Sequence, residues 1–285
     1  MIKHIVLLSF INFLFACHSQ EDKNSFANLI KGDWVGLEQS QEYTGNQSIF
    51  ASFEDSTYQM YIWHDTCKYE IIKDTLCLKN IDWKGHNQVN KFSIVKLTTD
   101  SLVLLSGKKQ EDTIRFSKVR AKNTITPAVI YFASSGCFGK CPIMNLEIDS
   151  LRNIRFYGES YTSKTGGFSG RISEKDYNSI IRKIRNLPLD SLQKFYEASV
   201  TDEETLGVSI VYGNRIIRSS AYGHENEPIE LHILFGKLIN LYKHVPMQSD
   251  SLVNPEYFSS KGNVLPDLIP PQEMLKFTPP KIVED

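Results

Sequence analysis

The fold of the first half of the chain is decided by the stretch KYEIIKDTLCLK at residues 68–79. Apolar and polar side chains alternate on both sides of Lys73-Asp74, which is typical of two half-buried strands joined by a tight turn. Similar short alternating segments come before and after this hairpin. The eight predicted strands are residues 33–38, 48–54, 57–63, 68–72, 75–79, 90–97, 101–106 and 112–119. Strands at such close spacing predict an up-and-down meander that closes into a small β-barrel over residues 27–121.

The first of these strands begins with Gly32-Asp33-Trp34. This Gly-x-Trp opening, with the strand pattern behind it, resembles that of lipocalin-like domains. The resemblance implies that Gly32 and Trp34 form a plug at one end of the barrel, and that the barrel holds a small apolar ligand. A packed interior is the favoured alternative to a ligand cavity. The inward positions expected to fill it are Ile49, Phe53, Tyr61 and Trp63.

The pattern changes to mixed helix and strand over residues 122–245. Strands are predicted at 128–133, 143–149, 153–158, 206–212 and 215–222. Ser173 followed by Asp176 is typical of a helix N-cap, and Pro188 is expected to end that helix. Further helices are predicted at 190–196 and 229–243. This order predicts an α+β sandwich, with two main helices against one face of an antiparallel sheet. The fold class is therefore mainly β plus α+β.

The N-terminus reads as a secretory signal. A weakly basic start is followed by an apolar run too short to span a bilayer, which takes ~20 residues. Leu14-Phe15-Ala16-Cys17 closes the run and resembles the lipobox of bacterial lipoproteins. The resemblance implies that residues 1–16 are removed and that Cys17 is acylated. Polar residues 17–26 would then be a tether to the membrane.

Charge and cysteine usage fit an extracytoplasmic protein. The chain has 32 basic and 33 acidic residues, so nothing in its balance points to nucleic acid. Setting Cys17 aside leaves four of the five cysteines, an even number that suggests disulfides in an oxidising compartment. Pairing of nearest neighbours would join Cys137 with Cys141 and Cys67 with Cys77. Because the Lys73-Asp74 turn places Cys67 opposite Asn80, the second bond would need a longer or bulged loop.

The segment GCFGKCP at residues 136–142 carries the most specific motif of the second domain. It resembles the signature of domain of unknown function 6438, a family of Bacteroidota-type envelope lipoproteins with a Cys-Phe-Gly-x-Cys-Pro loop. The likeness extends through Ile148, residues 156–158, Gly166-Gly167 and Asp202 to the last helix. The family has no established activity, so the resemblance implies a domain and no mechanism.

Two interpretations of Cys137 and Cys141 follow from their chemistry. An exchanging dithiol usually has Cys-x-x-Cys at a helix N-terminus, whereas this loop has one residue more and Pro142 leads into a strand. Lys140 is the one nearby charge that would favour a thiolate. The favoured interpretation is a disulfide that staples a glycine loop to the sheet. Two cysteines without a suitably spaced Cys/His pair predict no metal site, and no cofactor is predicted.

Other candidates are given structural interpretations. Ser169 lacks the context of a nucleophile elbow and is assigned to a turn. His224, His232 and His244 are expected at the surface, and Asp202-Glu203-Glu204 is expected to form a solvated loop. Residues 246–285 hold seven of the 11 prolines and predict an extended tail, either solvated or strapped across a domain.

The sequence as a whole predicts a non-catalytic lipoprotein of the cell envelope, anchored at the outer membrane on its periplasmic or surface face. It would bind a ligand, a glycan or another envelope protein. One alternative is an envelope thiol oxidoreductase that uses Cys137 and Cys141. Another is a carrier of a small apolar ligand in the barrel.

Overall fold

The computed structural model describes residues 26–38, 47–60, 66–81, 86–107 and 113–268. The chain divides into two compact units, Met1–Arg120 and Ala121–Asp285. The predicted signal peptide and Cys17 lie outside the described residues. None of the described helices has the length and apolar character needed to cross a membrane.

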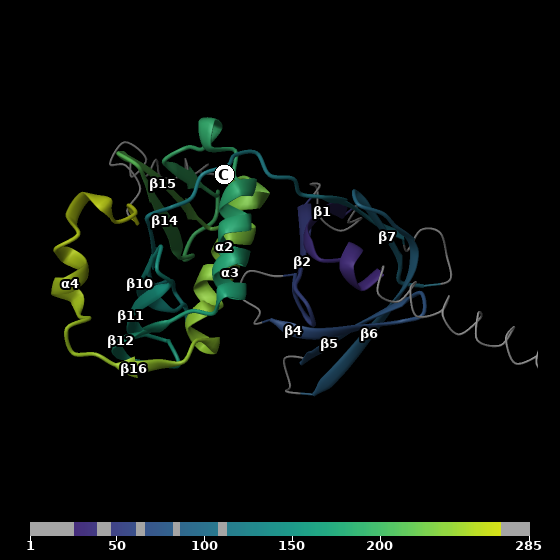
Figure 1. Ribbon diagram of the computed structural model, residues 1–285, viewed down its shortest axis with the longest axis horizontal. Helices are drawn as coiled ribbons and strands as arrows, with labels where there is room; N and C mark the ends of the chain where they lie inside the picture. The colour runs from purple at the N-terminus through teal and green to yellow at the C-terminus, as the bar shows by residue number, and fades with distance from the viewer. Residues whose placement is uncertain (1–25, 39–46, 61–65, 82–85, 108–112, 269–285) are drawn as a thin grey trace, which may run out of the picture. The chain divides into compact units, whose positions relative to one another are not determined.

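The first unit is a closed barrel of eight strands in chain order, as the alternation predicts (Figure 1). Its strands are β1 Gly32–Glu38, β2 Gln47–Phe53, β3 Thr57–Gln59, β4 Cys67–Ile72, β5 Thr75–Ile81, β6 Asn87–Leu97, β7 Ser101–Leu105 and β8 Thr113–Lys118. Neighbouring strands are antiparallel, and β1 closes the barrel by pairing with β8, where Trp34 lies opposite Lys118. The predicted lipocalin-like topology is thus confirmed as an eight-stranded antiparallel barrel.

Trp34 is fully buried beside the point where the chain enters the barrel. Its indole Nε1 donates a hydrogen bond to the Ile30 carbonyl oxygen over 2.6 Å, which satisfies the ring's one donor. The Lys118 Nζ lies 4.7 Å from the centre of the ring. Gly32 has a φ of 122°, which favours glycine, and a Cβ there would lie 2.9 Å from the Lys118 side chain. This is the environment of the residues predicted to form the plug.

The inward side chains of the described barrel strands pack into one cluster around Trp34. Phe53 is 1% exposed, and its ring meets that of Tyr69 edge-on at 5.1 Å. Ile49 packs against the same cluster, whereas the predicted inward residues Tyr61 and Trp63 lie outside the described residues. The fully or nearly fully buried members are Ile30, Trp34, Ala51, Phe53, Tyr58, Tyr69, Leu76, Leu78, Ile94, Leu97, Leu102, Leu104 and Phe116.

The second unit is an eight-stranded sheet with the order β13-β15-β14-β9-β10-β11-β12-β16. Its strands are β9 Val129–Ser134, β10 Ile143–Asp149, β11 Asn153–Ser160, β12 Gly166–Arg171, β13 Phe195–Glu197, β14 Thr205–Tyr212, β15 Arg215–Tyr222 and β16 Met247–Ser249. The pairs are antiparallel except β13 with β15, which is parallel. The predicted α+β class is confirmed.

The main helices α2 (Glu174–Asn186) and α3 (Ile229–His244) run alongside each other against this sheet (Figure 1). Ser173 caps α2 as predicted, because its Oγ accepts a hydrogen bond from the Asp176 amide. Side chains at alternate sheet positions meet α3. Phe156 stacks on Tyr242 with ring centres 4.7 Å apart, so β11 and α3 share one core.

Two predictions of local structure in this unit are wrong. Residues 190–196 form no helix beyond the short 3-10 turn η2 (Leu189–Ser191), because the Lys194 carbonyl accepts from the Ser220 amide and β13 pairs with β15. Ser169 lies in strand β12 rather than in a turn. The glycines around Ser169 allow neighbouring backbone to approach β12 closely. A Cβ on Gly167 would lie 1.7 Å from the Val253 carbonyl oxygen.

The start of the proline-rich tail is strapped across the second unit. After β16 come α4 (Pro255–Ser259) and the 3-10 turn η3 (Gly262–Val264). The Tyr257 hydroxyl lies 2.9 Å from each carboxylate oxygen of Glu147 on β10, and Phe258 is 2% exposed. Residues 269–285 lie outside the described part of the chain.

Candidate functional site

The loop between β9 and β10 carries the predicted disulfide. Cys137 and Cys141 are bonded, with their Cα atoms 5.7 Å apart. Backbone hydrogen bonds fix the loop, since the Phe138 amide donates to the Asp202 carbonyl and the Ser135 amide donates to the Thr205 carbonyl. This pairing was expected from the sequence and is confirmed.

The second suggested pair, Cys67 and Cys77, is not bonded. Cys77 lies opposite Glu70 in the β4–β5 ladder, so it points to the outer side of the barrel wall. Cys67 shares the inward side of β4 with Tyr69 and packs against the barrel core. The prediction fails because the two sulfurs lie on opposite faces of the same sheet.

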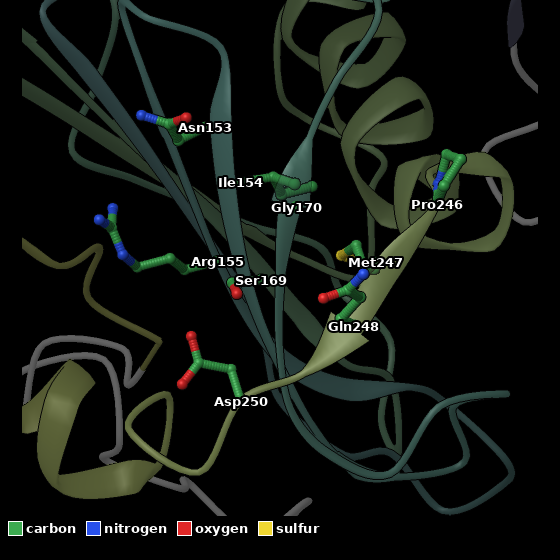
Figure 2. Close-up of a pocket in the computed structure, with 9 residues that line it drawn as sticks. All are labelled: Asn153, Ile154, Arg155, Ser169, Gly170, Pro246, Met247, Gln248 and Asp250. Carbon is green, nitrogen blue, oxygen red and sulfur yellow. The ribbon is translucent and has the colours of Figure 1, made fainter.

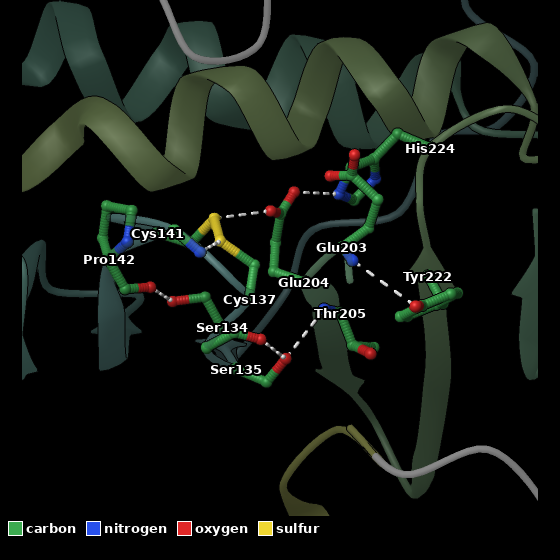
Figure 3. Close-up of a disulfide and its surroundings, with 12 residues drawn as sticks. Ser134, Ser135, Cys137, Cys141, Pro142, Glu203, Glu204, Thr205, Tyr222 and His224 are labelled. Carbon is green, nitrogen blue, oxygen red and sulfur yellow. Dashed lines mark hydrogen bonds and ion pairs between the residues drawn. A yellow bond between two sulfur atoms is a disulfide. The ribbon is translucent and has the colours of Figure 1, made fainter. Parts of the chain in front are cut away.

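Glu204, directly before β14, reaches the disulfide from the interior (Figure 3). Its side chain is 1% exposed, and its Oε2 lies 2.9 Å from the Cys141 Sγ. The following residue is tied to the same loop, because the Thr205 amide donates to the Ser135 Oγ over 2.8 Å. A buried carboxylate is thus held against one of the two sulfur atoms.

A chain of buried charged groups continues from Glu204. Its Oε1 lies 2.8 Å from the His224 Nε2, and the His224 Nδ1 lies 3.5 Å from the Glu227 Oε1. The same Glu227 oxygen lies 2.8 Å from the His232 Nδ1. The His224 and Glu227 side chains are 8% and 1% exposed. Two carboxylates and two imidazoles therefore alternate away from the disulfide, and the last of them, His232, is 21% exposed.

The protonation states in this chain follow from its contacts. Burial alone would lower the pKa of His224, but hydrogen bonds to Glu204 and Glu227 outweigh it and raise the pKa to about 9. Burial would raise the pKa of Glu227, but hydrogen bonds from His224 and His232 lower it to about 2. At neutral pH His224 is an imidazolium between two carboxylates.

Cys137 has a different environment from Cys141. The Gly139 amide lies 3.1 Å from the Cys137 Sγ and can donate to a thiolate there. Phe138, next to it, is 89% exposed, so the tip of the loop is open to solvent. The loop thus has one sulfur facing a backbone donor and the other facing a buried carboxylate.

Pockets in the same unit lie away from this loop. One of about 550 Å³ lies along β11, β12 and β16, where Arg155, Ser169, Gln248 and Asp250 contribute to its lining (Figure 2). The Arg155 guanidinium is already paired with Glu147 at 2.6 Å. A second pocket of about 560 Å³ lies between β9–β10 and the tail at Leu265–Leu268. The lining of neither pocket includes Cys137, Cys141 or Glu204.

Residues 128–242 match a known family model. This part of the chain is similar to the DUF6438 family. DUF6438 is a domain of unknown function, so the match supplies no activity. Cys137, Cys141, Glu204, His224 and Glu227 all lie inside the matched residues. No curated protein and no solved structure matches the chain.

The site brings together residues that the sequence pattern assigns to unrelated places. Glu204 was expected in a solvated loop and His224 at the surface, and both predictions are wrong. His232 is also partly buried, whereas His244 is exposed as predicted. The available signal was the position of Glu204 at the start of an apolar strand, where alternate side chains point inward. Cys17 lies outside the described residues, and its acylation stays a prediction.

Proposed function

We propose that this chain is an envelope thiol–disulfide exchange protein whose reactive pair is Cys137 and Cys141. The observation that carries the proposal is the buried Glu204 carboxylate, 2.9 Å from the Cys141 sulfur. A disulfide that only closes a short glycine loop needs no such group. Burying charge is costly, and ionised groups buried beside a reactive atom are a feature of functional sites.

The two sulfurs have separate roles in this proposal. Cys137 is the attacking thiolate, because the Gly139 amide can stabilise negative charge on its sulfur. Cys141 is the resolving cysteine, because Glu204 can accept the proton of its thiol. His224 is a positioning residue. Its imidazolium binds the Glu204 Oε1 and leaves the Oε2 directed at the sulfur.

The reaction proceeds in two steps. The Cys137 thiolate attacks one sulfur of a substrate disulfide, forms a mixed disulfide and releases the first substrate thiolate. Cys141 then gives its proton to Glu204 and attacks the Cys137 sulfur, which releases the second substrate thiolate. The two cysteines give two electrons to the substrate and form the Cys137–Cys141 bond. The two substrate thiolates take up one proton from Glu204 and one from solvent, and leave as thiols. The reverse sequence oxidises a substrate dithiol.

Location at the membrane is part of the proposal and rests on the sequence alone. Cys17 would carry the lipid, and residues 17–26 would tether the domains in the envelope. A non-catalytic binding role is the competing proposal, with a glycan, ligand or envelope protein as partner. The packed cluster around Trp34 favours a filled barrel over a carrier of small apolar ligands.

The test is the reduction potential of the Cys137–Cys141 pair, measured by equilibration with glutathione and with dithiothreitol. An exchanging pair should have a potential above about −300 mV, within the range of envelope oxidoreductases. The oxidised chain should also transfer its disulfide to a reduced peptide dithiol, and Cys137→Ser should abolish this transfer. A potential well below that range would identify a structural bond and would leave the binding proposal standing.

A further inference from the structure

Reduction of the Cys137–Cys141 disulfide leaves two thiols beside the Glu204 carboxylate. The Cys137 Sγ, the Cys141 Sγ and a carboxylate oxygen of Glu204 all lie within 4.8 Å of one another. We propose that, after reduction, these three groups bind one thiophilic divalent cation of the Zn²⁺ class. The inference depends on the proposed function only in requiring that the pair can be reduced.

The donor set matches the coordination chemistry of zinc. Thiolates bind Zn²⁺ at ~2.3 Å and carboxylate oxygens at ~2.0–2.2 Å, so ligand atoms in a tetrahedron lie ~3.5–3.8 Å apart. In the oxidised pair the two sulfurs are bonded, so reduction must first let them separate to this spacing. The cysteine Cα atoms, 5.7 Å apart, and the Glu204 oxygen, 2.9 Å from the Cys141 sulfur, keep the three groups within reach of one ion. Three protein ligands leave the fourth position for water or for a substrate thiol, as in zinc sites with an open position.

The surroundings orient the carboxylate ligand. The Glu204 Oε1 is bound by the His224 Nε2 at 2.8 Å, so the Oε2 is the oxygen that faces the sulfurs. Hydrogen-bonded outer partners of this kind fix ligating carboxylates in metal sites. His224 is held in turn by Glu227.

The negative charge of the reduced site favours binding of a cation. Two thiolates would add two negative charges beside the Glu204 carboxylate, which is 1% exposed. Like charges repel strongly in a buried site, where the dielectric constant is low. A divalent cation converts this repulsion into attraction, so the site is empty when oxidised and attractive to metal when reduced.

Oxidation and metal binding therefore compete for the same two sulfurs. When a substrate disulfide oxidises the metal-bound thiolates, two electrons pass to that substrate. With two protons from solvent it leaves as two thiols, the Cys137–Cys141 bond forms, and the cation is released. The site would make metal affinity a function of the thiol–disulfide balance of its compartment.

The test titrates Cd²⁺ and Zn²⁺ into the full chain before and after reduction by a phosphine. The reduced chain should bind one ion with a thiolate-to-metal charge-transfer band, and the oxidised chain should show no such band. Glu204→Gln should weaken binding at least ~10-fold, and His224→Gln by ~10–100-fold. Glu203→Gln, which changes the exposed neighbouring carboxylate, is the matched control and should leave affinity unchanged.

Two further variants keep the result interpretable. Cys137→Ser should abolish the band, whereas Cys67→Ser/Cys77→Ser, outside the site, should retain it. Equal binding by the oxidised chain, or loss of the band only in the Cys67/Cys77 variant, would overturn the inference. A pair that exchanges with glutathione yet binds no metal would overturn this inference alone. A pair reducible only by phosphine that binds metal would overturn the proposed function alone.

Discussion

Glu204 places a carboxylate oxygen 2.9 Å from the Cys141 sulfur across 63 residues of sequence. The contact joins the start of β14 to the loop before β10, two elements that both neighbour β9 in the sheet. It places a buried carboxylate beside an otherwise ordinary short disulfide.

Glu204→Gln should slow the resolving step of disulfide exchange by about 100-fold, because the amide keeps the shape of the side chain but cannot accept the Cys141 proton. The mixed disulfide on Cys137 should then accumulate, which mass spectrometry after acid quenching would detect. Glu203→Gln is the control. If both variants exchange at the wild-type rate over the whole pH range, Glu204 has no role in proton transfer.

The buried His224–Glu227 pair should make stability depend on pH in both directions. The folded pKa of His224 is raised from 6.5 to about 9, so its contribution is complete below about 6.5 and is lost as the pH rises through 9. The folded pKa of Glu227 is lowered from 4.5 to about 2, so its contribution is complete above about 4.5 and is lost as the pH falls through 2.

Urea unfolding should therefore show maximal stabilisation by this pair between about pH 4.5 and 6.5, with an alkaline decline of up to about 3 kcal/mol. His224→Gln should lose stability at pH 6 and flatten the alkaline limb. An unchanged alkaline limb in this variant would show that other groups cause the decline.

Trp34→Ala should destabilise the barrel by about 3–5 kcal/mol, because it removes a fully buried ring and leaves the Ile30 carbonyl without its indole donor. Ile81→Ala, at a site 65% exposed, is the control and should cost less than about 0.5 kcal/mol. Denaturation followed by near-ultraviolet circular dichroism measures both. An equal loss of stability in the two variants would show that Trp34 does not contribute to the core.

Gly167→Ala should loosen the tail from the second unit, since the new Cβ would collide with the Val253 carbonyl 1.7 Å away. Limited proteolysis should cut the chain between β16 and α4 faster than in the wild type. Leu252→Ala, at a site 79% exposed, should leave the cleavage rate unchanged. A wild-type cleavage pattern in the glycine variant would mean that the strap does not depend on this close approach.

Cys17→Ala should abolish incorporation of labelled fatty acid and release the chain from the membrane fraction, because the lipid is the expected anchor. Cys67→Ser retains Cys17 and is the control for cysteine removal. Continued labelling of the Cys17 variant would place the acyl group elsewhere.

The barrel and the main helices could be predicted because the patterns that specify them lie within short stretches of sequence. The alternation around Lys73-Asp74 and the Ser173–Asp176 cap depend on residues a few positions apart. Residues 190–196 were assigned wrongly because their backbone pairs with β15, a partner more than 20 residues away. Ser169 is wrongly placed in a turn because sequence alone does not reveal that the neighbouring Gly167 must lie close to the distant Val253 carbonyl.

The candidate site was only half predictable for the same reason. The Cys137–Cys141 bond is local, and its spacing indicated it. Glu204 looked like one of three solvated acids, since Asp202 and Glu203 beside it are indeed exposed. Only the sheet order, which sets β14 next to β9, brings its carboxylate to the sulfur.

The packing of the tail segment after β16 against the sheet also decides how long an expressed fragment of this domain must be. The family match ends at residue 242, yet Glu147 inside it is 4% exposed and takes two of its partners, Tyr257 and Lys261, from beyond that limit. A fragment trimmed to the matched residues would open this carboxylate and its sheet face to water. Expression fragments should therefore run at least to Leu268, and assays on shorter pieces would report on a damaged sheet.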